Sequence, residues 1–215
     1  MPGQPPGLST EEGALTGGTK GIRTYRLQLR LKALKFDPGE PDGAFGTKTT
    51  MAVWAYQALN GLAQDGVVSP DLEARILAAD APGMLRTDLG PTHSEVDLAK
   101  QVLLVFSDGQ LELVTHVSTG TGVAYCEISE KDGNRYCGDA ETPPGNFRFQ
   151  RRISGWRVSN LGRLYNPVYF NGGIAIHGAL SVPAGPASHG CVRIPMHIAG
   201  YFPDLVADGE PIAVI

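Results

Sequence analysis

The sequence Ser188-His189-Gly190-Cys191-Val192-Arg193 places a cysteine in a turn that glycine makes tight. A second histidine, His177, ends the apolar run Gly173-Ile174-Ala175-Ile176, which is typical of a buried strand. A cysteine thiol has an ordinary pKa of about 8.5, so it needs help from its surroundings to react at neutral pH. A histidine within hydrogen-bond reach, oriented by a third group, supplies that help. The pattern therefore predicts a thiol nucleophile and acyl transfer through a thioester.

Two histidines compete for the role of base. His189 lies two residues before Cys191, and a tight glycine turn leaves the direction of its side chain open. His177 is held by the strand that it ends, and the Pro- and Gly-rich loop that follows can fold back on the cysteine. Gly190 lets backbone N–H groups around Cys191 converge on a developing oxyanion. Arg193 is close enough to hold a substrate carboxylate.

Each of these residues also has a structural interpretation. A lone cysteine is most often a small buried hydrophobic residue, and a histidine at a strand end is often structural. The Ser-His-Gly-Cys context and His177 agree with each other, which favours catalysis for Cys191 and His177. For His189 a role in shaping the turn stays open, as does an ordinary surface ion pair for Arg193. No Cys-x-x-Cys or His-x-x-x-His pair is present, so we expect no metal ion and no cofactor.

The composition is that of a globular protein of one or two domains, with 215 residues, 42% of them hydrophobic, and a formal net charge of −4. This charge gives no reason to expect nucleic-acid binding, and no apolar stretch is long enough to cross a bilayer. No signal peptide follows Met1, so we expect either a cytoplasmic protein or one whose export signal is absent from this chain. The 28 glycines and 16 prolines favour turns and β-structure.

The first part of the chain is predicted to be helical. Residues 1–22 are rich in Gly, Pro, Ser and Thr and predict a flexible tail. In residues 23–79, Leu27, Leu31 and Leu34 have the spacing of one helix face. Helices are expected at about 25–34, 48–59 and 70–77, the second capped by Thr47 and the third opened by Ser69-Pro70. Together they predict a small three-helix bundle.

The second part is predicted to be mostly β. Residues 80–93 have the composition of a linker, and the hydrophobic period changes to two in residues 94–215. A strand or, as the alternative, a hairpin is expected at 95–106, and a strand at 111–118 follows the turn Ser107-Asp108-Gly109-Gln110. Further strands are expected at 146–151, 167–170, 173–177 and 211–215, with one helix at 196–206. The expected fold class is α+β, with a helical bundle followed by a sandwich- or barrel-like β domain.

These motifs resemble a known family. His177-Gly178 followed by Ser188 to Arg193 is similar to the signature of the L,D-transpeptidases, the cysteine enzymes that cross-link bacterial peptidoglycan. The resemblance covers residues 94–215 and includes the run Thr142-Pro143-Pro144-Gly145-Asn146-Phe147. The helical part resembles a three-helix peptidoglycan-binding domain through Asp42-Gly43-Ala44-Phe45-Gly46 and Asp65-Gly66-Val67-Val68. Both resemblances indicate peptidoglycan as the ligand, so each makes the other more credible.

The resemblance implies a mechanism. His177 takes the proton of Cys191, and the carbonyl of Gly178 holds the imidazole. The sulfur attacks the third residue of a tetrapeptide stem, D-Ala leaves, and an amine of another stem resolves the thioester to a 3→3 cross-link. Backbone N–H groups near His189, Gly190 and Cys191 would stabilise the oxyanion, with Ser188 as part of the same turn.

Further site residues are expected around this centre. Tyr169 and Phe170 line the donor groove or, as the alternative, pack in the core. Arg193 binds substrate, although some members of the family have Asn at this place. Cys126 and Cys137 flank a polar segment, and we expect a disulfide between them, with Cys191 as the free thiol and two reduced cysteines as the alternative.

The resemblance also implies partners and a location. We expect a monomer that is exported to the cell wall or periplasmic space, binds peptidoglycan stems and glycan, and is acylated by carbapenem β-lactams. One alternative is an L,D-carboxypeptidase that uses the same thioester with water as acceptor. Another is a wall-binding protein with a vestigial catalytic domain, against which the intact Cys191 and His177 argue.

Overall fold

The computed structural model describes residues 13–215, and the larger part of the predicted tail lies outside this range. The chain divides at Gly83 into two compact units, except that Leu113–Thr115 group with the first unit, and each unit is described by itself. Residues 13–21 correct the prediction of a tail. Leu15 is fully buried and exchanges two backbone hydrogen bonds of 2.8 Å with Val68. One large apolar side chain thus anchors a segment whose composition alone indicates flexibility.

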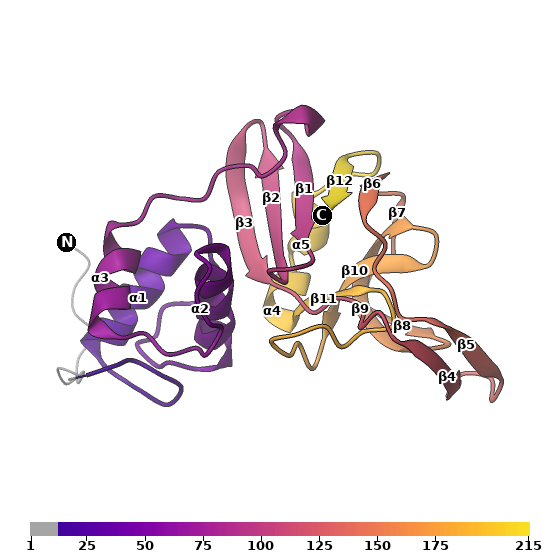
Figure 1. Ribbon diagram of the computed structural model, residues 1–215, viewed down its shortest axis with the longest axis horizontal. Coiled ribbons are helices and arrows are strands. Elements are labelled where there is room, and N and C mark those ends of the chain that lie inside the picture. Colours follow the sequence, from indigo (N-terminus) through magenta and orange to yellow (C-terminus); the bar gives the residue numbers. More distant parts are fainter. Residues whose placement is uncertain (1–12) are drawn as a thin grey trace. The chain divides into compact units, whose positions relative to one another are not determined.

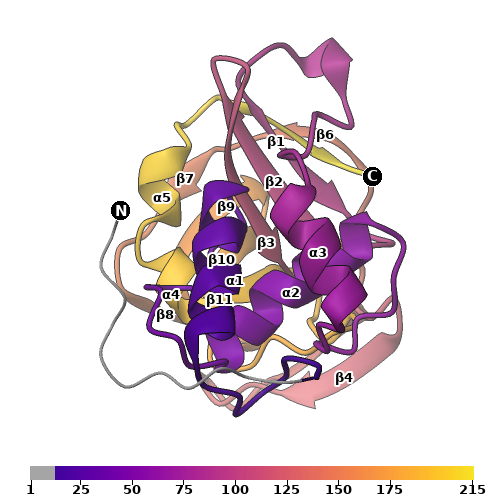
Figure 2. The same cartoon turned by 90° about the vertical axis from the view of Figure 1, so that its left-hand side faces the viewer.

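The first unit contains the three predicted helices, α1 (Ile22–Ala33), α2 (Thr47–Leu59) and α3 (Pro70–Ala78), which Figure 2 shows side by side. Leu27, Leu31 and Leu34 are buried, as their spacing on one helix face predicts. Ser69 caps α3, because its side chain accepts a hydrogen bond from the N–H of Leu72. Thr47 is not the cap of α2: it is the first helical residue, and Gly46 takes the cap position.

Two loops of this unit are each fastened by a buried glutamine. Gln28 donates from Nε2 to Oδ1 of Asp42 at 3.0 Å, and its Oε1 accepts from the N–H of Gly43 at 2.8 Å. In the same way Gln57 donates to Oδ1 of Asp65 at 2.7 Å and accepts from the N–H of Gly66. The two Asp-Gly turns are therefore held by equivalent polar contacts, in which each amide uses both its donor and its acceptor.

The second unit contains two five-stranded sheets and a separate hairpin (Figure 1). The first sheet has the order β3-β2-β1-β12-β6, in which β1 and β12 are parallel. Its strands are β1 (His93–Asp97), β2 (Val102–Ser107), β3 (Gln110–His116), β6 (Gly145–Arg148) and β12 (Pro211–Val214). The 3₁₀ turn η1 (Thr87–Leu89) precedes it.

The second sheet carries the predicted site. Its order is β11-β10-β9-β7, and β8 also pairs with β9. The strands are β7 (Arg151–Arg152), β8 (Trp156–Ser159), β9 (Gly162–Asn171), β10 (Ile174–Ala179) and β11 (Val192–Pro195). The hairpin, formed by β4 (Ala124–Ile128) and β5 (Arg135–Asp139), was not among the predicted strands, because most of its side chains are exposed and it lacks an apolar alternation.

The predicted helix at 196–206 is two short helices, α4 (Met196–Ala199) and α5 (Phe202–Leu205). Pro203 lies in the first turn of α5, where the missing N–H of proline costs nothing, so the sequence favours a new helix over a continued one. Within residues 13–215 no helix is long and apolar enough to cross a membrane.

We predict that Gln28→Leu destabilises the helical unit by about 3 kcal/mol, because the Asp42-Gly43 turn loses its buried partner while the side-chain volume changes little. Denaturant unfolding of the full chain measures the change. Gln64→Leu is the matched control, since Gln64 makes only a long contact of 3.4 Å to the carbonyl of Trp54. Equal unfolding midpoints for the two variants would contradict this assignment.

Candidate active site

The parallel pairing of β10 and β11 brings the two halves of the predicted site together. Ile176 pairs with Val192, and His177 pairs with Arg193. Cys191 immediately precedes β11, so it lies two residues from Arg193 along the same backbone. Side chains two residues apart on a strand point to the same face. The register therefore places Cys191, Arg193 and His177 on one face, and all three line one cavity.

His177 is buried, with 5% of its surface exposed, and its Nδ1 lies 2.9 Å from the carbonyl oxygen of Gly178. A carbonyl only accepts, so Nδ1 carries the proton and Nε2 is left with its lone pair. Burial lowers the pKa of His177 to about 4, and the nearby positive charge of Arg193 acts in the same direction. The imidazole is thus neutral at neutral pH and can accept a proton at Nε2.

Cys191 is a free, partly buried thiol whose Sγ lies 3.9 Å from the carbonyl oxygen of Gly173. Burial raises its pKa, while a backbone hydrogen bond from Ala175 and the charge of Arg193 oppose that rise. Because the pKa of the thiol is raised and that of His177 is lowered, the resting pair is a neutral thiol and a neutral imidazole. Proton transfer from sulfur to nitrogen would accompany attack on a substrate.

The turn before Cys191 is fixed by side-chain hydrogen bonds. The hydroxyl of Ser188 donates to the carbonyl of Cys191 and accepts from the N–H of Gly190 at 3.0 Å. Thr142 donates to the carbonyl of Gly190 at 2.8 Å and accepts from the N–H of Gly120. Because the N–H of Gly190 donates to Ser188, the predicted oxyanion site would depend on the N–H groups of His189 and Cys191.

Gly190 itself is required by the backbone. Its φ of +125° is a conformation that other residues rarely adopt. A Cβ atom there would also lie 2.7 Å from the carbonyl oxygen of Glu141. Gly178 is similarly confined, because a Cβ would lie 2.6 Å from that of Ala199. Both glycines allow a close approach that holds the cysteine turn and the histidine strand in place.

The cavity has a volume of about 560 Å³. Among the predicted site residues it is lined by Cys191, His177, Ser188, His189, Arg193 and Tyr169. Its other lining residues include Trp156 on β8 and Arg163 on β9, and the guanidinium of Arg163 lies 4.9 Å from the ring centroid of Trp156. No Asp or Glu side chain is among the described residues that line it. The cavity therefore suits a ligand that brings a carboxylate.

Arg193 is more buried than Arg163, the other arginine that lines the cavity. Its backbone pairs with Ser118 through two hydrogen bonds of 3.0 Å, which fixes where the side chain starts. Burial lowers its pKa, and in the described part of the chain no carboxylate forms an ion pair with it. A cation that has lost water without gaining a counterion is stabilised by an anionic ligand. The described residues thus do not show the surface ion pair that was the alternative for Arg193, and its side chain lines the cavity.

The prediction that Phe170 lines the donor groove is wrong, and this side chain takes the alternative, a place in the core. It is fully buried, does not line the cavity, and packs against Phe147 with ring centroids 5.6 Å apart. Tyr169 does line the cavity, and the guanidinium of Arg151 lies 3.6 Å from its ring centroid. Neighbouring residues of a strand face opposite sides, so only one of the pair can reach the site. The sequence shows two adjacent aromatic residues but not which face each takes.

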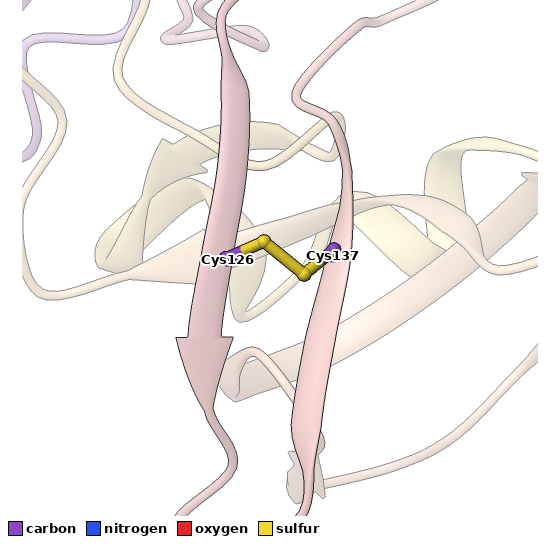
Figure 3. Close-up of a disulfide and its surroundings, with 2 residues drawn as sticks. All are labelled: Cys126 and Cys137. Carbon is purple, nitrogen blue, oxygen red and sulfur yellow. A yellow bond between two sulfur atoms is a disulfide. The ribbon is translucent and has the colours of Figure 1, made fainter.

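The disulfide between Cys126 and Cys137 is confirmed (Figure 3). The two cysteines are directly opposite each other on β4 and β5. Tyr136, also on β5, lines the cavity, and this residue was missed by the sequence analysis. Trp156 and Arg163 were not predicted to line the cavity either. The only signal for them in the sequence is an aromatic residue in a segment that contains several arginines.

Comparisons with known proteins find similar proteins for both parts of the chain. Residues 91–214 match the model of the L,D-transpeptidase catalytic domain, and residues 21–76 match that of a peptidoglycan-binding domain. A crystal structure of an L,D-transpeptidase from Xylanimonas cellulosilytica is 34% identical, with a TM-score of 0.84, and the match covers 96% of this chain and 100% of that one. An L,D-transpeptidase from Stackebrandtia nassauensis, 22% identical over 97% of each chain with a TM-score of 0.50, shares the fold.

We predict that Gly190→Ala disrupts the turn, because the new Cβ meets the carbonyl of Glu141 and the backbone is strained at positive φ. The expected result is a loss of about 2 kcal/mol in unfolding free energy and slower alkylation of Cys191 by iodoacetamide. Gly185→Ala in the same loop is the control, since no atom lies within 4 Å of its Cβ position. Similar behaviour of both variants would show that Gly190 is not required.

Proposed function

The chain belongs to the L,D-transpeptidase family, whose members act on peptidoglycan, and from this premise we propose that it transfers the acyl group of a stem peptide through a thioester on Cys191. The observation that carries the proposal is the pairing of β10 with β11, which brings a buried neutral histidine and a free thiol to one cavity. The Nδ1 proton of His177 is held by Gly178, which turns the basic nitrogen away from that carbonyl.

The first half of the reaction forms the thioester. Sγ of Cys191 attacks the carbonyl carbon of the third stem residue while Nε2 of His177 takes the thiol proton. The carbonyl electron pair moves to oxygen, and the N–H groups of Cys191 and His189 stabilise the resulting charge. When the tetrahedral intermediate collapses, the C–N bond to D-Ala breaks, and the imidazolium returns its proton to the leaving amine.

The second half consumes the thioester. A side-chain amine of another stem attacks the carbonyl carbon and gives a proton to His177 as the C–N bond forms. The C–S bond then breaks, and the sulfur regains a proton as the free thiol. The product is a 3→3 cross-link. If water takes the place of the amine, the same residues release a tripeptide and the enzyme is an L,D-carboxypeptidase.

The charge of the cavity supports a stem peptide as the donor. Arg193 is half-buried, lies beside Cys191 and His177, and suits a carboxylate near the reacting carbonyl. Tyr169 contributes an apolar surface to the same cavity. The absence of acidic side chains among the described lining residues avoids repulsion of an acidic peptide.

The helical unit supports the choice of polymer. We assign it to binding of peptidoglycan, and we place the protein in the cell wall or periplasmic space, where the exposed Cys126–Cys137 disulfide persists. We expect a monomer whose helical domain includes residues 13–21, before the predicted boundary at residue 23, and whose second domain includes His93 at the start of β1. Carbapenems, which carry a reactive acyl group and a carboxylate, are proposed to acylate Cys191.

We predict that incubation with a disaccharide-tetrapeptide adds the mass of the donor minus D-Ala to the protein, and that peptide mapping finds the added mass on Cys191. Cys191→Ala abolishes it, and His177→Gln lowers the rate by about a hundredfold or more, the usual contribution of a general base. Intact-mass spectrometry of quenched samples is the measurement. A wild-type protein that gains no mass, or a Cys191→Ala variant that still consumes the donor, would sink the proposal.

The products of the same incubation identify the acceptor. Cross-linked dimers are expected as the main product, with tripeptide as a minor one. Tripeptide alone, at saturating concentrations of the amine-bearing stem, would identify a carboxypeptidase instead.

A further inference from the structure

We propose that the disulfide-closed β4–β5 hairpin is a wall of the active-site cavity that positions His189, and that it thereby sets how well Cys191 reacts with a large acyl donor. The proposal rests on the proposed function, because it concerns the same cavity. It assigns a role to Tyr125, Glu127 and Tyr136, none of which the catalytic steps use. Neither strand of the hairpin was among the predicted strands, and β8 and β11 were not predicted either.

Two side chains of β4 contact His189. Oε1 of Glu127 lies 2.9 Å from Nε2 of the histidine, and the ring of Tyr125 meets the imidazole edge-on, with centroids 4.7 Å apart and planes at 69°. An ionised carboxylate only accepts, so Nε2 carries a proton and donates it. The carboxylate fixes the direction of the ring, and Tyr125 fixes its tilt. His189 is thus oriented by β4, outside the loop that carries it.

The register of the hairpin explains why these residues act together. Glu127 is directly opposite Tyr136, and Tyr125 is directly opposite Gly138. Residues opposite each other in an antiparallel pair share a face, as do residues two apart on one strand. Tyr125, Glu127 and Tyr136 therefore share one face of the hairpin. Through Tyr136 this face lines the cavity, and through the other two residues it contacts His189.

Gly138 lies on the same face, and because it has no side chain it leaves room for the ring of Tyr125. A Cβ at Gly138 would lie 3.2 Å from the hydroxyl oxygen of Tyr125, so the tyrosine lies across the glycine on its way to His189. Tyr136 is held as well, because its hydroxyl donates to Oδ2 of Asp132 at 2.7 Å. Each aromatic residue that reaches the site is thus fixed from within the hairpin.

The disulfide lies on the opposite face. Cys126 and Cys137 alternate with the site-facing residues, and both are exposed to solvent. A two-stranded hairpin is marginally stable in water by itself, and most side chains of β4 and β5 are exposed. The covalent link replaces a core that the hairpin lacks. It joins the two strands directly (Figure 3) and so holds the register between Glu127 and Tyr136, and neither cysteine is among the described residues that line the cavity.

This arrangement separates two kinds of reactivity. The intrinsic reactivity of Cys191 depends on His177, Gly178 and the turn at Gly190, which lie outside the hairpin. The fit of a peptide donor depends on the cavity wall and on His189. Loosening the hairpin should therefore slow the reaction with a peptide donor and leave the reaction with a small alkylating agent unchanged. Glu127, Tyr125 and the two cysteines are positioning residues in this sense.

The test compares Glu127→Ala and the double variant Cys126→Ser/Cys137→Ser with the wild type, using the full chain. Glu130→Ala is the matched control, because Glu130 is an exposed acid in the turn of the same hairpin and is not among the described residues that line the cavity. Two rates are measured for each protein: alkylation of Cys191 by iodoacetamide, and release of D-Ala from a disaccharide-tetrapeptide as a function of its concentration. Glu127→Gln, which keeps an acceptor oxygen, serves as the conservative variant.

We expect kcat/KM for D-Ala release to fall about tenfold in Glu127→Ala, the size of one charge-assisted hydrogen bond, mainly through a higher KM. The double cysteine variant, and the wild type reduced with a phosphine, should fall similarly, and reoxidation should restore the reduced protein. Glu127→Gln should lie between Glu127→Ala and the wild type. Alkylation rates should agree within twofold in all variants, which also shows that the site remains folded.

Three outcomes would overturn the proposal. Variants that release D-Ala as the wild type does would show that the hairpin has no positioning role. Equal losses in alkylation and D-Ala release would show that the hairpin only supports the fold. A wild-type protein that is alkylated normally but releases no D-Ala would overturn the proposed function and this inference with it, whereas the first two outcomes leave the proposed function intact.

Discussion

The parallel pairing of β10 with β11 is the constraint on which the rest of the site depends. One register places His177 beside Arg193 and puts Cys191 at the start of the partner strand. A shift by one residue would turn the cysteine to the other face of the sheet, away from the histidine. The fold protects this register with two glycines, Gly178 and Gly190, where no Cβ can be accommodated. The catalytic geometry is therefore a property of backbone packing as much as of the reactive side chains.

The same packing sets the charge state of the site. Burial lowers the pKa of His177 and raises that of Cys191, so the two groups rest as imidazole and thiol. A neutral pair needs no counterion and tolerates an apolar surrounding better than an ion pair does. Arg193 and Arg163 then carry the permanent charges of the cavity lining, and we propose that Arg193 favours an acidic donor. In the proposed mechanism, binding of the donor would use a charge, whereas proton transfer would begin between two neutral groups.

The sequence predicted most of what is local and little of what is long-range. The leucine spacing of α1, the Ser69-Pro70 start of α3 and the apolar run of β10 were sufficient for these elements, because periodicity and capping are local properties. Leu15 shows the limit, since its burial depends on Val68 far along the chain. Tyr136 and Glu127 reach the site from an exposed hairpin without hydrophobic alternation, so no local pattern indicates them.

The central claim is that β10 holds His177 as a neutral base with the proton on Nδ1. The most direct measurement is a ¹⁵N NMR titration of the imidazole in the resting protein. The predicted result is an Nδ1–H tautomer that persists through neutral pH and becomes protonated only as the pH falls through about 4. An imidazolium at pH 7, or a proton on Nε2, would contradict the account, because the pair would then be a preformed thiolate–imidazolium or lack a base directed at the thiol.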